Sequence, residues 1–217
     1  MIESLTVVAP MRNEEETART FLERLTSALG SNAKQWRIII PVTATDQTAA
    51  VLRRYPVVIL DVPPGLGVAY SVGLKKALEY ESPVLTLDTD LSHVPEEMSR
   101  LLEVDGDLVL GARATTAAPL RRRLISWIVN WVLGGAYSDY TSAYRLYTRP
   151  VLEDVLPRVK SQGFAFLPEF VFRALHSGFR VTEVKVSFPS RVAGTSKMSL
   201  RANLTEYLRF LVWRYFS

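Results

Sequence analysis

Cysteine is absent from the 217-residue sequence, and histidine occurs only as His93 and His176. The lack of cysteine excludes disulfide bonds, thiolate metal sites and cysteine nucleophiles, and it fits a reducing compartment. The two histidines are isolated, so we expect both to be structural. Neither a P-loop, a nucleophile elbow nor a histidine-rich metal motif appears.

Long apolar runs are also missing. The longest, residues 124–137, is interrupted by Ser126 and Asn130 and falls short of the ~20 residues that a membrane-spanning helix needs. The first residues show no basic region followed by an apolar stretch, so no secretory signal is visible. We therefore expect a protein that is soluble or bound peripherally to a membrane.

The net charge of +4 is divided unevenly along the chain. Residues 1–112 carry 10 Lys and Arg against 16 Asp and Glu, whereas residues 113–217 carry 16 against 6. A basic C-terminal half suggests an anionic partner such as nucleic acid, a membrane surface or a phosphorylated substrate. Arginine predominates among these basic residues, which favours phosphate because its guanidinium binds phosphate with two hydrogen bonds.

Strands and helices alternate through the first half of the chain. Hydrophobic patterning predicts strands at 5–9, 36–40, 57–60, 84–87 and 107–111, and helices at 14–29, 46–54, 65–80 and from 95 onward. The second half is less regular, with helices expected at 120–133, 168–177 and 199–216 and strands at 144–147 and 179–188. Strands that are apolar throughout predict an α/β protein with a mostly parallel, Rossmann-like sheet covered on both faces. We expect a single domain over 1–217.

Asp88 and Asp90 follow a buried strand, separated only by Thr89. Ligands of open parallel sheets bind at the carboxyl ends of the strands. Two carboxylates so close repel each other unless a cation or water lies between them, and oxygen ligands of this kind suit Mg²⁺ or Mn²⁺ holding a diphosphate. A solvated turn with helix-capping aspartates is the alternative.

Gly65-Leu66-Gly67 opens an expected helix. Two glycines there could cradle a phosphate at the helix N-terminus, although a simple turn is the better interpretation. The segment is not a dinucleotide fingerprint, because the third glycine is missing.

Arg121-Arg122-Arg123 precede an apolar segment that contains Trp127 and Trp131. Such a segment is typical of an interfacial anchor, in which arginine meets lipid phosphate and tryptophan lies at headgroup level. A core helix with a charged first turn explains it equally well. The amphipathic C-terminal helix leaves the same two readings open.

Seven motifs together resemble the family 2 glycosyltransferases and, within them, the dolichol-phosphate mannose synthases. The resemblance covers nearly the whole chain, and the motifs occur in the family's order. They are residues 7–14 (VVAPMRNE), 65–70 (GLGVAY), 87–95 (LDTDLSHVP), 111–113 (GAR), 122–126 (RRLIS), 138–147 (SDYTSAYRLY) and 188–197 (FPSRVAGTSK).

This resemblance implies a GT-A fold and metal-dependent, inverting transfer of mannose from GDP-mannose to dolichyl or another polyprenyl phosphate. It also implies roles for individual residues. The nucleotide would be lined by Pro10, Arg12 and Glu14. Mg²⁺ or Mn²⁺ and the donor diphosphate would be held by Asp88 and Asp90, with Ser92 beside them. The acceptor phosphate would be received by Arg113, Arg122 and Ser126, and both substrates would be covered by Arg191 and Lys197.

The implied reaction needs no strong general base, because the acceptor phosphate is already anionic. The protein must align that phosphate and stabilise the departing nucleoside diphosphate by electrostatics. We assign no catalytic base. Asp139 is either an orienting group or a structural residue.

Two departures from the family pattern concern the donor. The family usually places two aspartates after its second strand, one of which reads the nucleobase, but Pro41 and Val42 stand there. A basic residue is also usual shortly before the glycine pair, where this chain has Asp61. Another donor, such as UDP-glucose, or a non-catalytic homologue that binds lipid or a partner protein, therefore remain alternatives.

The charge division fits the resemblance, with a nucleotide-sugar-binding half over 1–112 and an acceptor-binding, membrane-facing half over 113–217. We expect a peripheral protein on the cytosolic face of a membrane, and the need for a transmembrane partner subunit stays open. Nucleic acid is an unfavourable partner, because the basic residues lie beside tryptophan-rich apolar segments.

Overall fold

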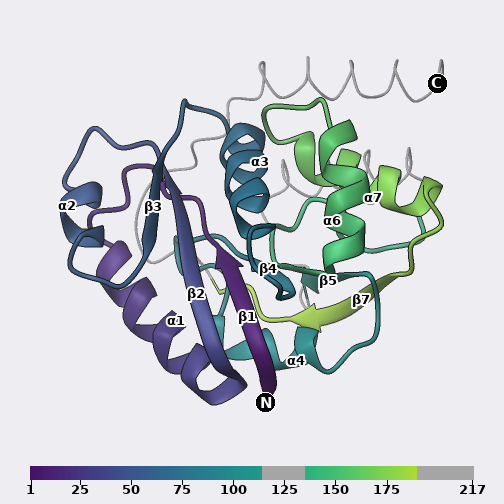
Figure 1. The fold of residues 1–217 in the computed structure, drawn as a ribbon, viewed down its shortest axis with the longest axis horizontal. Helices are drawn as coiled ribbons and strands as arrows, with labels where there is room; N and C mark the ends of the chain where they lie inside the picture. The colour runs from purple at the N-terminus through teal and green to yellow at the C-terminus, as the bar shows by residue number, and fades with distance from the viewer. Residues whose placement is uncertain (114–134, 190–217) are drawn as a thin grey trace.

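A seven-stranded sheet organises the chain in the order β3-β2-β1-β4-β6-β5-β7 (Figure 1). The structure is a computed structural model, and it describes residues 1–113 and 135–189. The strands are β1 (Ile2–Val8), β2 (Ala33–Val42), β3 (Val58–Asp61), β4 (Val84–Thr86), β5 (Leu108–Arg113), β6 (Arg145–Tyr147) and β7 (Val181–Val186). All the expected strands are present, and their first and last residues differ from the expected ones by a few positions at most.

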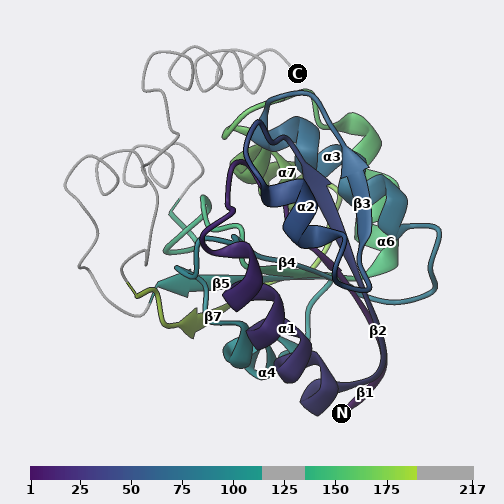
Figure 2. The same cartoon turned by 90° about the vertical axis from the view of Figure 1, so that its left-hand side faces the viewer.

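Helices cover both faces of this sheet, as its apolar strands require. Helix α1 (Ala18–Asn32) and α4 (Met98–Leu102) lie on one face, and α3 (Leu66–Ala77), α6 (Arg149–Val155) and α7 (Phe166–His176) lie on the other (Figure 2). The short α2 (Thr48–Leu52) follows β2, and two 3₁₀ turns span Pro95–Glu97 and Leu156–Arg158. The mixed α/β architecture with a mostly parallel sheet is thus confirmed.

Two hydrophobic cores result, one on each face. Phe21 and Leu25 of α1 pack against Val7 and Ile40, whereas Leu74 of α3 belongs to the opposite core with Val8 and Ile39. Successive residues of β1 and β2 therefore point to opposite cores, as the two-residue period of a strand dictates.

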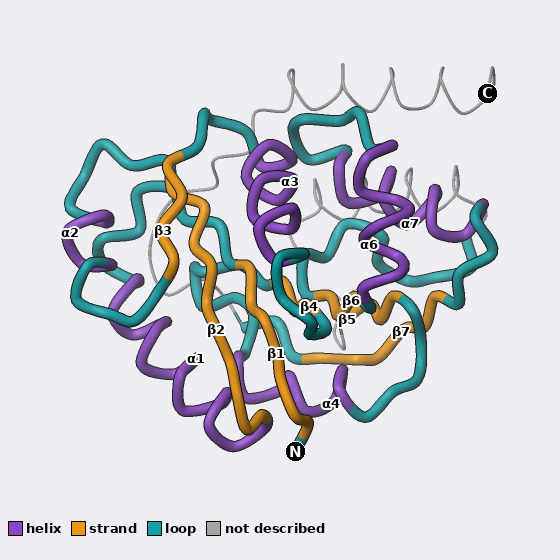
Figure 3. Tube along the Cα trace, in the orientation of Figure 1, coloured by secondary structure: helices purple, strands orange, loops and turns teal. Residues whose placement is uncertain are grey.

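Strand β6 departs from the parallel pattern. It is labelled beside β4 and β5 in Figure 3. It runs antiparallel to both of these neighbours, so β4 and β5 remain parallel to each other. The chain must therefore enter β6 from the carboxyl edge of the sheet. As a result, residues 138–143 lie at the same edge as the ends of β1, β2 and β4.

Helix α6 was not expected from the sequence. Its seven residues are too few to show a helical period, and only the proline at its first turn marks it. The helices expected at 120–133 and 199–216 lie outside the described residues. Among residues 1–113 and 135–189, no helix has the length and apolar character to cross a membrane.

Candidate active site

Asp88 and Asp90 lie where β4 ends, in a turn fixed by short local hydrogen bonds. Oδ1 of Asp90 accepts the backbone N–H of Ser92 at 3.0 Å, and the N–H of Asp88 donates to Nδ1 of His93 at 2.7 Å. Leu91 between them has φ of 61°, a left-handed conformation that is costly for leucine. This strain indicates that the hydrogen bonds on either side of Leu91 impose the turn.

The Asp88 carboxylate is half-buried and flanked by two rings. The Tyr70 hydroxyl lies 3.5 Å from its Oδ1, and Nε2 of His93 lies 3.6 Å from its Oδ2. Burial, followed by the nearby Asp88 charge, raises the pKa of Tyr70 well above its ordinary value. Tyr70 therefore remains protonated and can donate a hydrogen bond to the carboxylate.

Two carboxylates form a suitable partial site for Mg²⁺ or Mn²⁺. These cations prefer oxygen ligands, and Mg²⁺ usually binds through one or two carboxylates together with substrate phosphates and water. Within the described ranges no group of three or more His, Cys, Asp or Glu residues could hold a metal by itself. The residues therefore fit a cation that shares its coordination with a bound diphosphate.

The turn after β1 lies against this loop. The hydroxyl of Thr89 donates to the carbonyl of Pro10 at 3.3 Å, which joins the β1 end to the aspartate loop. Arg12 is exposed two residues later. Oε2 of Glu14 accepts the Thr17 hydroxyl at 2.8 Å at the start of α1. Pro10, Arg12 and Glu14 thus lie at the carboxyl edge of the sheet.

Asp46 holds the loops after β1 and β2 together, a role that sequence reasoning missed. Its carboxylate accepts the N–H and hydroxyl of Thr48 and the N–H of Glu15. Partial burial acts to raise the pKa of Asp46, but these hydrogen bonds outweigh it and lower the pKa below its ordinary value. Asn13 adds a second link, because its Oδ1 accepts the N–H of Thr45 at 2.9 Å.

Arg113 at the end of β5 lies beside Asp139. Its Nε is 3.6 Å from Oδ2 of Asp139, and its guanidinium lies over the ring of Phe188 at 4.3 Å. The edge of Phe188 meets the buried His93 ring at 4.8 Å between centroids. Packed side chains therefore connect the expected acceptor residue Arg113 with the expected metal ligand Asp88. Both residues belong to motifs quoted from the sequence, but His93 was expected to be only structural and Phe188 was given no role.

Asp139 also organises its own turn. Its Oδ1 accepts the N–H and the hydroxyl of Thr141 at 3.0 and 2.7 Å. The preceding Ser138 donates its N–H and its hydroxyl to Glu183 of β7. Asp139 therefore stabilises its own turn and also lies within ion-pair distance of Arg113.

Gly65 and Gly67 serve close packing rather than an open phosphate cradle. A Cβ on Gly67 would lie 2.7 Å from the carbonyl carbon of Gln162 and from the carbonyl oxygen of Ser161. The N–H of Val68 donates to the Gln162 carbonyl at 3.0 Å, so the first turn of α3 is capped by this loop. Gly65 has φ of 148°, which favours glycine.

A buried ion pair supports that loop. Both oxygens of Glu169 accept backbone N–H groups, from Lys160 at 3.0 Å and Ser161 at 2.9 Å, and Arg173 donates to Oε1 at 2.8 Å. Both charged side chains are almost fully buried. The close contact of the glycine pair with this loop favours the interpretation as a turn.

Four expected site residues lie outside the part of the chain that the structure describes. They are Arg122, Ser126, Arg191 and Lys197. The expected interfacial segments, which contain Trp127 and the C-terminal helix, also lie there. Asp88, Asp90, Ser92 and Arg113 are brought to one region of the carboxyl edge.

The architecture is that of the GT-A fold. It resembles glucosyl-3-phosphoglycerate synthase from Mycobacterium tuberculosis, solved with Mn²⁺, UDP and phosphoglyceric acid, with a TM-score of 0.74 at 15% identity. That match covers 96% of this chain and 78% of the other. A second structure of the same enzyme, with Mg²⁺ and UDP, gives a TM-score of 0.71 at 14% identity, covering 96% and 79%.

The sequence identifies the family more specifically. The pattern of glycosyl transferase family 2 matches residues 6–124, more than half of the chain, and the protein belongs to that family.

Two curated relatives are similar over part of the chain. A polyprenol monophosphomannose synthase of Mycolicibacterium smegmatis is 41% identical over 149 residues, covering 62% of this chain and 56% of the relative. An undecaprenyl-phosphate mannosyltransferase of Micrococcus luteus is 37% identical over 148 residues, covering 62% and 61%. The chain thus spans less than two thirds of the length of either relative.

Proposed function

We propose that this protein transfers mannose from GDP-mannose to a polyprenyl phosphate, with inversion at the anomeric carbon and with Mg²⁺ or Mn²⁺. The observation that carries the proposal is the convergence of Asp88 and Asp90 with Arg113 at one sheet edge, connected through His93 and Phe188. The names of the two curated relatives support the mannosyl and polyprenyl-phosphate parts. The division between an acidic and a basic half supports separate donor and acceptor regions.

In the proposed reaction an oxygen of the acceptor phosphate attacks the anomeric carbon of the sugar. A new carbon–oxygen bond forms while the bond to the nucleoside diphosphate breaks, and the leaving diphosphate takes the electron pair. Arg113, held by Asp139 and Phe188, would orient the acceptor phosphate together with Arg122 and Ser126. No proton has to be removed from the acceptor, which explains why no general base is assigned.

Asp88 and Asp90 would hold the divalent cation, and Arg191 and Lys197 would close over the substrates. The cation, when bound, neutralises charge that develops on the departing diphosphate. The hydrogen bonds of Asp90 with Ser92 and of Asp88 with His93 fix the loop before the reaction, so little reorganisation is needed at that stage.

A different donor for the same chemistry is the second candidate. Val42 lies where a base-reading aspartate is expected, and its side chain is buried in the core at 2% exposure. It therefore offers no hydrogen bond to any base. This observation favours a test with several nucleotide sugars, UDP-glucose included.

The test is a transfer assay with the purified chain, polyprenyl phosphate in detergent and labelled GDP-mannose, UDP-glucose or GDP-glucose, with and without Mn²⁺ or Mg²⁺. Label entering the organic phase only from GDP-mannose, and only with metal, supports the proposal. Label from UDP-glucose alone replaces the donor and retains the mechanism. A folded protein that transfers no sugar, with or without a membrane fraction, contradicts the enzymatic role and favours a homologue that binds lipid or protein.

We further propose that the protein acts at the cytosolic face of a membrane, as a peripheral protein. The basic C-terminal half and the Arg- and Trp-bearing segment at 121–131 support this placement. Co-sedimentation with vesicles of anionic and neutral lipid tests it, because binding should increase with anionic lipid and decrease with salt. If the protein needs a transmembrane partner subunit, the purified chain should transfer sugar only when the membrane fraction is added.

The Asp139→Asn variant should raise the KM for polyprenyl phosphate about 5- to 20-fold while the KM for the donor stays unchanged. Asparagine can still accept the Thr141 hydrogen bonds through its oxygen, but it removes the charge 3.6 Å from Arg113 Nε. Steady-state kinetics with each substrate varied in turn measure the effect. Equal changes in both KM values would contradict an acceptor-orienting role and indicate a general disturbance of the site.

A further inference from the structure

The ends of β1, β2 and β3 form one hydrogen-bonded surface at the carboxyl edge of the sheet. The N–H of Thr43 donates to the Met11 carbonyl at 3.0 Å, and the Thr43 hydroxyl donates to the Val62 carbonyl at 2.7 Å. The N–H of Val62 in turn donates to the Val42 carbonyl at 3.0 Å. The segment that follows β3 is therefore attached to the same surface as the turn that contains Pro10 and Arg12.

Most carboxylates at these strand ends are already engaged. Asp46 accepts three hydrogen bonds, Glu14 accepts the Thr17 hydroxyl, and Glu15 accepts the N–H of Gln47 at 2.9 Å. Asp61 differs from them. Its side chain is exposed, and it forms no hydrogen bond or ion pair with any residue in the described ranges 1–113 and 135–189. Asp61 is therefore an exposed carboxylate at this edge that is available to a ligand.

The register places Asp61 beside the buried end of β2. Asp61 is the Cα partner of Val42 in the parallel β2–β3 pair. The sheet order β3-β2-β1-β4 puts three strand spacings between Asp61 and Asp88, roughly 14 Å at about 4.8 Å per strand. A nucleoside diphosphate whose phosphates lie at Asp88 and whose base extends across β1 and β2 brings the far edge of that base to the end of β3.

We propose that Asp61 reads the base of the donor nucleotide and selects guanine. This inference rests on the proposed function and specifies its donor site. Guanine presents two adjacent donors, N1–H and the 2-amino group, which match the two oxygens of one carboxylate. Uracil presents a single N–H between two carbonyl groups, so a carboxylate gains one hydrogen bond and meets a repelling carbonyl oxygen. Selection therefore comes from β3 and not from β2, where Val42 cannot contribute.

Nucleotide binding provides a test that is independent of sugar transfer. Calorimetric titration with Mn²⁺ present should show the wild-type chain binding GDP about 10-fold more tightly than IDP, which lacks the 2-amino group. UDP should bind more weakly than GDP by a similar factor or more. Each estimate corresponds to the loss of one hydrogen bond to a charged group.

The Asp61→Asn variant exchanges one acceptor for a donor at an exposed position, so the fold should be unaffected. The GDP affinity of this variant should fall at least 10-fold. Its XDP affinity should be about 10-fold higher than that of the wild-type chain, because the asparagine amide can donate to the 2-oxo group of xanthine. A loss of stability alone would not produce this gain. The matched control is Asp105→Asn, an exposed aspartate before β5, and it should leave both affinities unchanged.

The outcomes separate this inference from the proposed function. If Asp61→Asn leaves the ranking of GDP, IDP, XDP and UDP as in the wild type while transfer from GDP-mannose proceeds, Asp61 does not read the base and the proposed function stands. If the wild-type chain binds UDP in preference to GDP, selection of guanine is wrong. If it binds none of the four diphosphates, the donor site itself is refuted along with the inference.

Discussion

Replacing Asp90 by asparagine is expected to reduce sugar transfer by about 10²- to 10³-fold at saturating substrates. The effect is large because the charge lost is the one that would hold the cation opposite the departing diphosphate. Asparagine retains an oxygen that can accept the Ser92 N–H now bonded to Asp90 at 3.0 Å, so the turn should persist. Transfer rates at several Mn²⁺ concentrations measure the effect, and the apparent metal affinity should fall with the rate.

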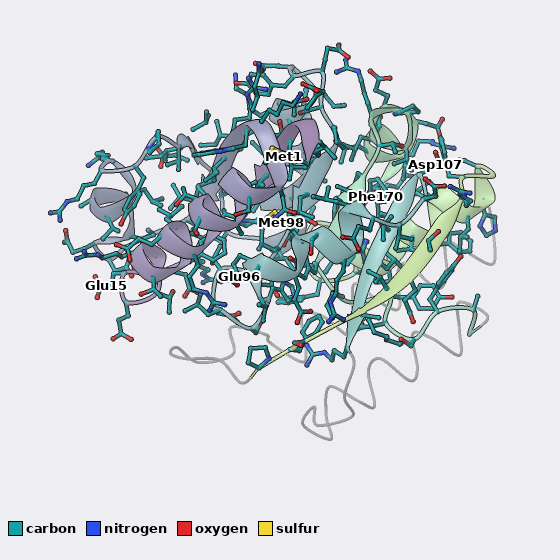
Figure 4. The ribbon with its side chains drawn as sticks, turned by 90° about the horizontal axis from the view of Figure 1, so that it is seen from below. Met1, Glu15, Glu96, Met98, Asp107 and Phe170 are labelled. Atoms are coloured by element: carbon teal, nitrogen blue, oxygen red, sulfur yellow. The ribbon has the colours of Figure 1, made fainter. Side chains whose placement is uncertain are left out.

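Asp107→Asn is the matched control for Asp90→Asn. Asp107 also accepts a backbone N–H, from Arg180 at 2.8 Å, but it precedes β5 and so lies at the amino edge of the sheet. Figure 4 shows it far from Glu15, which belongs to the turn after β1. Its variant should keep full activity. Near-normal transfer by Asp90→Asn would remove the metal role from this residue and leave Asp88 to be tested by itself.

Local patterns allowed the sequence to predict much of the site. Asp88 and Asp90 belong to the loop directly after a buried strand, and that strand was visible as a short apolar run. The parallel sheet followed from the alternation of such runs with helices. Asp88 and Asp90 could then be assigned to the carboxyl edge, because every parallel strand ends there. Pro10 and Arg113 were named only through the family resemblance.

Contacts between distant parts of the chain were beyond sequence reasoning. Asp46 joins two loops, and its hydrogen bonds to Glu15 and Thr48 leave no local signal. The same holds for the stacking of Arg113 on Phe188. The direction of β6 was equally hidden, because a three-residue strand carries no sign of whether its neighbours run parallel or antiparallel.

The sequence pattern of Gly65 and Gly67 is compatible with two interpretations, and the structure favours one of them. Glycines at the start of a helix fit both a phosphate cradle and a close backbone contact. The backbone of Ser161 and Gln162 occupies the space beside Gly67, and the Gln162 carbonyl accepts a hydrogen bond from the first turn of α3. Nearly a hundred residues separate the two segments, so no local pattern could have revealed this contact.

The Gly67→Ala variant should therefore be strongly destabilised, by about 3 kcal/mol in the free energy of unfolding. The added methyl group would meet backbone atoms at 2.7 Å, and these cannot rotate away as the end of a side chain can. Glu169 holds Lys160 and Ser161 from the other side, so a retreat of the loop would also weaken buried hydrogen bonds. At roughly 3 °C per kcal/mol for a chain of this size, Tm should fall by about 9 °C.

Gly30→Ala makes the same chemical change where nothing opposes it. Gly30 lies within α1, and an added Cβ there would meet no atom within 4 Å. This variant should be more stable than the wild type by about 0.5–1 kcal/mol, because alanine loses less backbone entropy in a helix. Thermal and urea unfolding of both variants measure the contrast. Equal stability of the two would show that the loop at 161–162 moves away easily, and the glycine would then have no packing role.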